Sequence, residues 1–145
     1  MKNQDRRSGF YGTRKQGWFK RLIALLTLLS FLCEPTLAAA QVVADPTAGS
    51  ARPRIDSAAN GVPLVQITNP SAAGVSRNQY QQFNVDPQGA ILNNSISLTL
   101  THQAGYVDAN PYLTRGSARI ILNEVTGAGL SSLQGYTEVA GSRAE

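Results

Sequence analysis

Apolar residues recur along the chain in short runs separated by turn residues, and the chain beyond residue 40 lacks the periodicity of an amphipathic helix. The clearest pattern lies at Ser95–Thr101, where Ile96, Leu98 and Leu100 alternate with serine and threonine. Alternate residues of a strand point to the same side, so the three apolar side chains would share one face. The pattern therefore predicts a strand with one buried face and one face in solvent.

Further strands are predicted wherever an apolar run lies between turn residues. Ala118–Asn123 is the second clear strand, and Gly135–Val139 alternates less cleanly. The other predicted strands are Gln41–Ala44, Val62–Ile67, Tyr80–Val85 and Ala90–Leu92. Turns rich in Asn, Pro and Gly separate these runs, and His102–Gly116 is predicted to be a loop. Short strands with frequent turns favour an all-β sandwich, barrel or solenoid, with almost no helix.

One short motif suggests a repeat. Ile91-Leu92-Asn93 recurs thirty residues later as Ile121-Leu122-Asn123. A β-solenoid coil of three short strands with turns needs roughly twenty to thirty residues, which fits this spacing. Asparagines stacked in successive coils can form a hydrogen-bonded ladder. Two strands that end in asparagine by chance explain the recurrence equally well.

The first forty residues have the layout of a secretory signal peptide. Seven Lys and Arg residues precede an uncharged apolar run at Leu22–Leu32, and small residues follow at Ala38 and Ala40. Cleavage is expected between Ala40 and Gln41. The run of eleven residues is expected to be helical. It is shorter than the ~20 residues of a bilayer-spanning helix, which favours a signal peptide over a membrane anchor.

Removal of this leader changes the charge of the protein. The precursor carries a net charge of +4, but all seven leader cations lie before residue 22. The remaining chain has six arginines, no lysine and seven acidic residues, a net charge of −1. Because a nucleic-acid-binding protein needs a basic face to neutralise phosphates, this composition argues against a nucleic-acid partner.

The residues that usually carry catalysis or bind metals are sparse. The single cysteine, Cys33, lies in the leader, so the mature chain has no disulfide and no Cys/His zinc site. His102 is the sole histidine and has no recognisable nucleophile partner. The carboxylates Asp108, Glu124 and Glu138 are isolated on different segments. We expect no enzyme activity and no cofactor.

The quoted runs resemble a known family. NGVPLVQITNPSAAGVSRNQYQQFNV, QGAILNNS, GYVDANPYL and ARIILNEVTGAGLSSLQGYTEVAG are similar, in order and spacing, to the N-terminal secretion domain of two-partner-secreted exoproteins. These are the filamentous haemagglutinin-like and contact-dependent growth-inhibition proteins, with a haemagglutination-activity domain. The resemblance covers Ala59–Ala144 and implies a right-handed parallel β-helix with an N-terminal cap. It also implies an outer-membrane pore protein as partner, and export through the periplasm to the cell surface or medium.

A turn motif marks this family. The family sequence Asn-Pro-Asn-Leu is Asn110-Pro111-Tyr112-Leu113 here, so that Asn110, Pro111 and Leu113 match and Tyr112 departs. Such a turn either serves the fold alone or also contacts the partner, and the structural role is favoured. The expected organisation is a signal peptide at 1–40, an extension or cap at 41–58 and a partial secretion domain at 59–145. The family pattern continues beyond Glu145 into a further strand and turn.

Two functions follow from the resemblance. In the first, the partner pore recognises the chain by strand addition along Ser95–Thr101, with Ile96, Leu98 and Leu100 in alternate pockets. Once outside, the first coil of the domain nucleates β-helix folding. In the second, a β-solenoid adhesin module binds glycans or a host or neighbouring cell surface through Gln79, Tyr80, Gln81 and Gln82. A polar strand face with Tyr80 in the core is the favoured interpretation of that segment.

Overall fold

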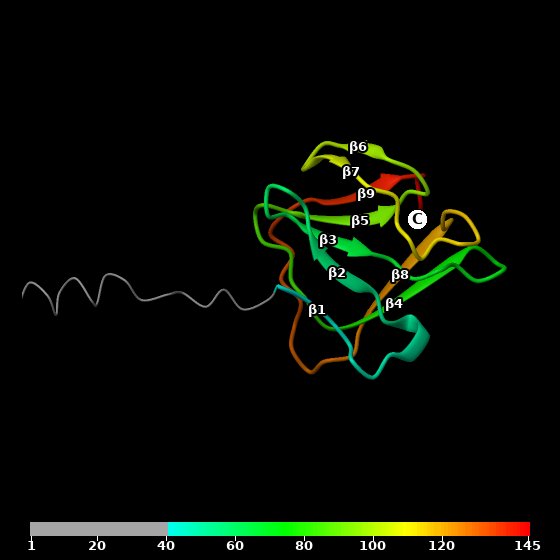
Figure 1. Cartoon of the computed structure of the whole chain (residues 1–145). Helices are drawn as coiled ribbons and strands as arrows, with labels where there is room; N and C mark the ends of the chain where they lie inside the picture. Colours follow the sequence, from blue (N-terminus) through cyan, green and yellow to red (C-terminus); the bar gives the residue numbers. More distant parts are fainter. Residues whose placement is uncertain (1–40) are drawn as a thin grey trace, which may run out of the picture. The chain divides into compact units, whose positions relative to one another are not determined.

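The computed structural model describes residues 41–145, which form nine strands and one short 3₁₀ helix (Figure 1). In chain order these are β1 (Val42–Ala44), η1 (Gly49–Ala51), β2 (Arg54–Ser57), β3 (Pro63–Gln66), β4 (Val75–Phe83), β5 (Ala90–Asn94), β6 (Thr99–Thr101), β7 (Gly105–Val107), β8 (Ile120–Val125) and β9 (Thr137–Gly141). The all-β prediction is therefore confirmed for this part of the chain. The predicted signal peptide, with Ala38 and Ala40 at its cleavage site, lies outside the described residues.

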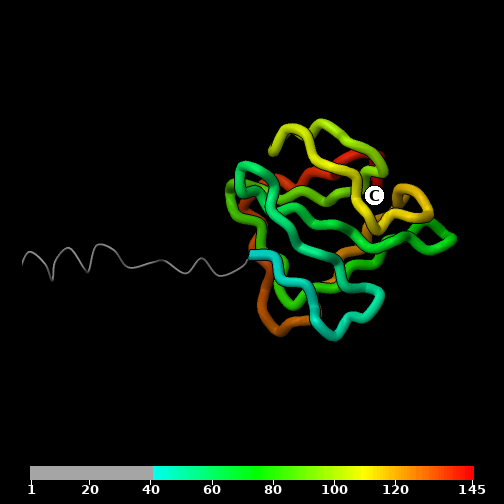
Figure 2. The backbone as a smooth tube through the Cα atoms, in the orientation of Figure 1, coloured from blue at the N-terminus to red at the C-terminus, as the bar shows by residue number. Residues whose placement is uncertain are grey.

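Three sheets organise these strands. One has the order β1-β4-β8, a second has the order β2-β3-β5-β9, and β6 and β7 form a separate two-stranded sheet. The pairs β3-β5, β5-β9 and β4-β8 are parallel, as in a β-helix, and an isolated parallel bridge joins Val85 to Leu133. The first two strands, β1 and β2, instead run antiparallel to β4 and β3. In Figure 2 the tube passes back and forth through these layers, from the cyan N-terminal strands to the red C-terminal strand.

The register gives the length of each coil. Leu64 pairs with Ile91, a spacing of 27 residues, whereas Val75 pairs with Ile120, a spacing of 45. The second coil is longer because it contains the β6-β7 hairpin, which lies outside β5 and β9 (Figure 1). The two Ile-Leu-Asn motifs lie on β5 and β8, in different sheets, so they are not stacked equivalents. The interpretation of their thirty-residue spacing as a coil repeat was wrong.

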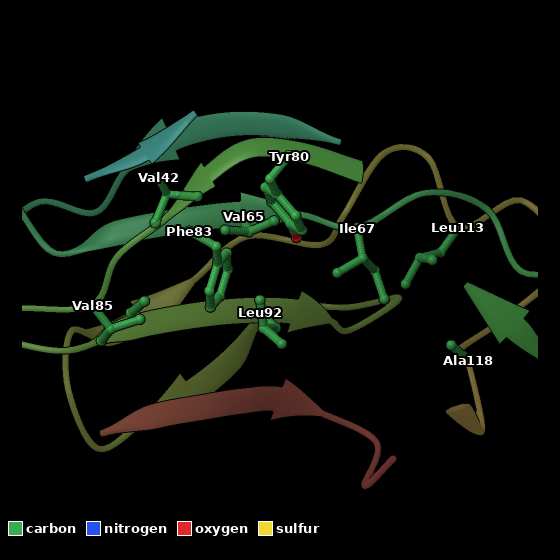
Figure 3. Close-up of a cluster of buried hydrophobic side chains, with 10 residues drawn as sticks. Val42, Val65, Ile67, Tyr80, Phe83, Val85, Leu92, Leu113 and Ala118 are labelled. Atoms are coloured by element: carbon green, nitrogen blue, oxygen red, sulfur yellow. The ribbon is translucent and has the colours of Figure 1, made fainter. Parts of the chain in front are cut away.

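The main hydrophobic core lies between the two larger sheets (Figure 3). Val65, Tyr80 and Leu92 meet there, and the Tyr80 and Phe83 rings pack edge to face with centroids 4.8 Å apart. A second, smaller cluster lies on the outer face of the β2-β3-β5-β9 sheet, beneath the hairpin; its buried members are Val62, Leu64, Ile91, Val107 and Ala140. Since both faces of β5 are covered, all five of its residues are buried.

The structure contains two strands that the sequence did not predict. Loop was predicted throughout His102–Gly116, but this segment contains β7. The segment 41–58 contains β2, which the composition did not indicate. Both strands are only three or four residues long, and pairing to a neighbour, rather than their own sequence, makes them strands. Residues 41–145 contain no helix that is long and apolar enough to cross a membrane.

Candidate functional site

The predicted half-buried strand at Ser95–Thr101 is different in the structure. Only Thr99–Thr101 forms a strand, and Ile96, Leu98 and Leu100 are 61–64% exposed. The prediction that these apolar side chains face the core was therefore wrong. Local hydrogen bonds explain why residues 95–98 do not form a strand. Ser95 N–H donates to Asn93 Oδ1 (3.1 Å), and Ser97 N–H donates to Ser95 Oγ (3.3 Å). Such side-chain bonds compete with a strand ladder.

These exposed residues lie on β6 and on the segment just before it. Leu100 lies directly opposite Tyr106 in the β6-β7 register, and Tyr106 is 70% exposed. We call the set of Ile96, Leu98, Leu100 and Tyr106 the hairpin surface. The other face of the hairpin is buried, with Val107 in the second core cluster. Clustered exposed apolar side chains on a well-packed element are typical of an interaction site.

The hairpin is fixed to the parallel sheet by polar contacts. The Glu138 carboxylate on β9 accepts hydrogen bonds from the backbone N–H groups of His102 (2.8 Å) and Gln103 (3.0 Å). The Gln103 side-chain amide donates to Ala90 O (3.2 Å), and the Asn60 amide donates to Gln103 O (2.7 Å). The exposed apolar residues are thus presented on a held element. Sequence reasoning missed Glu138, because nothing near it in the chain indicates this role.

The Asn110-Pro111 turn points two of its family-matching residues inward. The Asn110 amide donates to Ile67 O (3.0 Å) and Asn93 O (2.8 Å), and its oxygen accepts from Tyr112 N–H (2.9 Å). Leu113 is buried in the main core, whereas Pro111 and Tyr112 are exposed. Asn110 therefore joins the ends of β3 and β5, and the residue that departs from the family pattern lies at the surface.

Tyr80 is fully buried, so it offers no ring for stacking on a sugar. Burial raises the pKa of its phenol well above the usual range, and its hydroxyl donates to Asn123 Oδ1 (3.1 Å). On the outer face of β4 the Gln79 amide donates to Glu124 (3.0 Å). The hydrogen bonds and charge of Arg77 hold the pKa of the Glu124 carboxyl below its usual value. Tyr80 is thus a core residue, as the favoured interpretation of this segment predicted.

The carboxylates considered for catalysis lie on separate elements. Glu124 is on β8, Glu138 is on β9, and Asp108 follows β7. Over residues 41–145, no group of three or more His, Cys, Asp or Glu side chains is placed to hold a metal ion. Glu124 pairs with Arg77 and Glu138 with backbone N–H groups, so each has a structural partner.

A further set of polar contacts, which the sequence did not reveal and which we call the Asp45 clamp, holds the N-terminal strand. The Asp45 carboxylate is buried and accepts hydrogen bonds from Thr126 Oγ1 (2.6 Å) and from Thr47 N–H (2.8 Å) and Oγ1 (2.7 Å). It thereby joins the end of β1 to the residue that follows β8. The Asp45-Pro46-Thr47 sequence is compatible with such an Asx turn, and that was its only local signal.

The Asp45 clamp predicts sensitivity to acid. The hydrogen bonds from Thr126 and Thr47 lower the folded-state pKa of Asp45. Its stabilisation is therefore complete above the unfolded pKa of about 3.9 and is lost as the pH falls through the folded pKa. Hydrogen-exchange mass spectrometry on the secreted protein, corrected for intrinsic exchange rates, should show β1 losing protection in this range. Asp45→Asn should lack this pH dependence, and the exposed control Asp108→Asn should keep it. Identical profiles for all three proteins would contradict the clamp.

Stacked parallel strands, an antiparallel start and a projecting hairpin with exposed apolar side chains together define a β-helix-like module. The TPS (two-partner secretion) domain model matches residues 40–145. The chain is 48% identical over 133 residues to "Toxin CdiA" of Yersinia pestis, which covers 87% of this chain and 4% of that protein. It is also 44% identical over 107 residues to "Hemolysin" of Serratia marcescens; this alignment covers 74% of this chain and 6% of that protein.

A solved structure, the secretion domain of filamentous hemagglutinin, superposes with a TM-score of 0.63 at 36% identity, covering 72% of this chain and 33% of that one. The chain belongs to the TPS secretion domain family, as the sequence resemblance predicted. It spans about one twenty-fifth of the length of the Yersinia pestis relative. The family comprises non-catalytic targeting domains, and the exoproteins that carry them are secreted across the outer membrane.

Proposed function

We propose that residues 41–145 target an exported exoprotein to the periplasmic domains of an outer-membrane TPS partner pore. The observation that carries this proposal is the hairpin surface, four large apolar side chains that remain 61–70% exposed on β6, β7 and the segment before β6. A single exposed leucine is unremarkable, but four large apolar side chains exposed within residues 96–106 fit a recognition surface.

Strand addition is the proposed mode of recognition. The hairpin sheet contains two strands only, so each of its strands has one edge without a ladder partner among residues 41–145. An extended strand of the partner can pair with such an edge, while Leu98 and Leu100 enter apolar pockets. Before the hairpin forms, the whole of Ser95–Thr101 can adopt the extended conformation that this mode requires.

Nucleation of folding is the second part of the proposal. The strands β8 and β9 are the last in their sheets, so their outer edges can accept the next parallel strands. Apolar side chains that stack on the main core are incompletely covered at this end: Ile121 and Val139 are partly buried, and Leu133, which is bridged to the buried Val85, is 66% exposed. Each further coil would bury such residues and satisfy backbone groups, and that free energy would favour movement of the chain outward.

The Asn110-Pro111 turn has a structural role in this proposal. Its asparagine amide satisfies the carbonyl groups that end β3 and β5, and Leu113 fills the core. Neither side chain has free surface for the partner.

Site-specific photo-crosslinking tests the recognition surface. A crosslinking amino acid at Leu98 should give an adduct with the periplasmic domains of the partner pore during export. The same group at Leu130, which is 97% exposed on the loop between β8 and β9, should give none. Adducts of equal yield at both sites, or none at Leu98, would refute recognition through the hairpin surface.

A further inference from the structure

The Glu138 carboxylate is buried in a way that needs an explanation. Its residue is 6% exposed and lies on the outer face of β9, on the side of the second core cluster. The ion pairs among residues 41–145 join Arg54 to Asp56 and Arg77 to Glu124, and neither includes Glu138. A buried carboxylate without compensating bonds is strongly disfavoured.

The compensation comes from the turn of the β6-β7 hairpin. Each Glu138 oxygen accepts one backbone N–H, from His102 at 2.8 Å and from Gln103 at 3.0 Å. Successive N–H groups of a turn form a concave site for an anion, and hydrogen bonds to a charged acceptor are stronger than neutral ones. The carboxylate and the turn therefore stabilise one another, and neither is satisfied when they are apart.

The Gln103 side chain adds to this arrangement. Its amide donates to Ala90 O at 3.2 Å, at the start of β5. A Cβ atom on Gly89 would collide with the Gln103 side-chain oxygen, so the glycine leaves the space that this side chain occupies. The turn thus contacts both β5 and β9, and Val107 and Ile91 both belong to the second core cluster.

The order of these residues in the chain gives the contact a consequence. His102 and Gln103 precede Glu138 by 36 and 35 residues. Glu138 reaches them only when β9 is paired with β5, where it lies opposite Ile91. The hairpin is therefore completed by a strand that is added later in the chain.

We propose that Glu138 is a positioning residue that latches the β6-β7 hairpin when β9 closes onto β5, and that this closure releases the hairpin segment from the partner pore. The release part rests on the proposed function. While β9 is unpaired, residues 95–107 can extend and pair with a partner strand. After closure, β6 and β7 pair with one another and the turn is bound to Glu138. Residues 95–107 can then no longer extend and pair with the partner strand.

Hydrogen exchange on the full-length secreted protein tests the latch without the partner. Glu138→Gln should raise exchange of the backbone amides in residues 99–107 about tenfold, because one carboxylate bond is lost and the other weakened. Exchange in β3 should stay unchanged. Glu124→Gln, which removes a carboxylate from the opposite sheet, is the matched control and should not affect the hairpin. Hairpin exchange equal to that of the parent protein would overturn the latch.

A second variant keeps the latch testable if the Glu138→Gln protein does not fold. If Glu138→Gln lowers the yield of folded protein, Asn60→Ala loosens the same turn by removing the donor to Gln103 O, and should also raise hairpin exchange. If it does not, the latch is refuted.

Dissociation from the purified periplasmic domains tests release. The Glu138→Gln protein should dissociate several-fold more slowly than the parent, whereas a merely structural loss would speed dissociation or leave it unchanged. Faster or equal dissociation overturns the release coupling. Because closure removes the extended form, a folded parent protein that does not bind agrees with release, provided that the Glu138→Gln protein binds. If neither protein binds, the proposed function fails, and the exchange experiment still decides the latch.

Discussion

Secretion should fall to background when Ile96 and Leu98 are both replaced by aspartate, with no loss of folded structure. These side chains are 61% and 63% exposed, so a charge at either position is solvated and has little effect on the free energy of unfolding. In an apolar pocket of the partner the same carboxylates would be desolvated, at a cost of several kcal/mol each. The measurement is the ratio of extracellular to periplasmic protein by immunoblot, with proteolysis of the periplasmic fraction to test folding.

Leu130→Asp is the matched control for this experiment. Leu130 is also an exposed leucine, at 97%, but it lies on the loop after β8, away from the hairpin surface in the chain. This variant should be secreted like the parent protein. Normal secretion of the Ile96→Asp, Leu98→Asp protein would dispose of recognition through this surface. An equal defect in the Leu130→Asp protein would mean that any added charge at an exposed leucine blocks export.

Replacement of Asn94 by alanine should be among the most destabilising single changes in the domain. The fully buried Asn94 amide donates to Ala118 O (2.8 Å) and Ser142 O (2.9 Å), and its oxygen accepts from Ala118 N–H (2.7 Å). Alanine would leave the two buried backbone groups of Ala118 without their partner, each costing roughly 1–3 kcal/mol, and would also remove the part-buried bond to Ser142 O. The free energy of unfolding should fall by about 3 kcal/mol or more. Denaturant unfolding of the complete secreted domain, followed by far-UV circular dichroism, gives this quantity.

Two further variants define the cause of that loss. Asn94→Asp keeps the acceptor for Ala118 N–H but places a carboxylate beside two carbonyl oxygens, so it should be at least as destabilising. Asn69→Ala removes an exposed amide that bonds to Thr114 and Arg115 and should cost less than about 1 kcal/mol. Similar losses for Asn94→Ala and Asn69→Ala would contradict the role assigned to the buried amide.

Most strands could be predicted from the sequence because a strand is indicated by a short apolar run between turn residues, which is a property of neighbouring residues alone. The runs Val62–Ile67 and Ala90–Leu92 overlap β3 and β5, and Ala118–Asn123 overlaps β8. Short apolar runs between turn residues have few alternatives to a strand. The same reasoning missed β7, whose strand character depends on pairing with β6. The family resemblance, which draws on the order of many motifs, was confirmed by the match over residues 40–145.

The alternating pattern at Ser95–Thr101 shows where such reasoning fails. Alternation predicts that one face differs from the other, but it does not say which face meets the core. Here the buried residues of the hairpin are Thr101 and Val107, and the leucines point to solvent. The second core cluster already occupies the space beneath the hairpin, so the apolar face of this segment has no core to enter.

What the sequence determined by itself is a helix-poor chain of short strands and tight turns, the family to which it belongs, and the turn at Asn110. These properties depend on neighbouring residues and on the order of motifs. Only the tertiary structure decided that Glu138 binds the hairpin turn, that Asn94 joins β5 to Ala118 and Ser142, and that Asp45 holds Thr126. Those contacts join residues 24 to 81 positions apart, and chain folding, not local preference, brings them together.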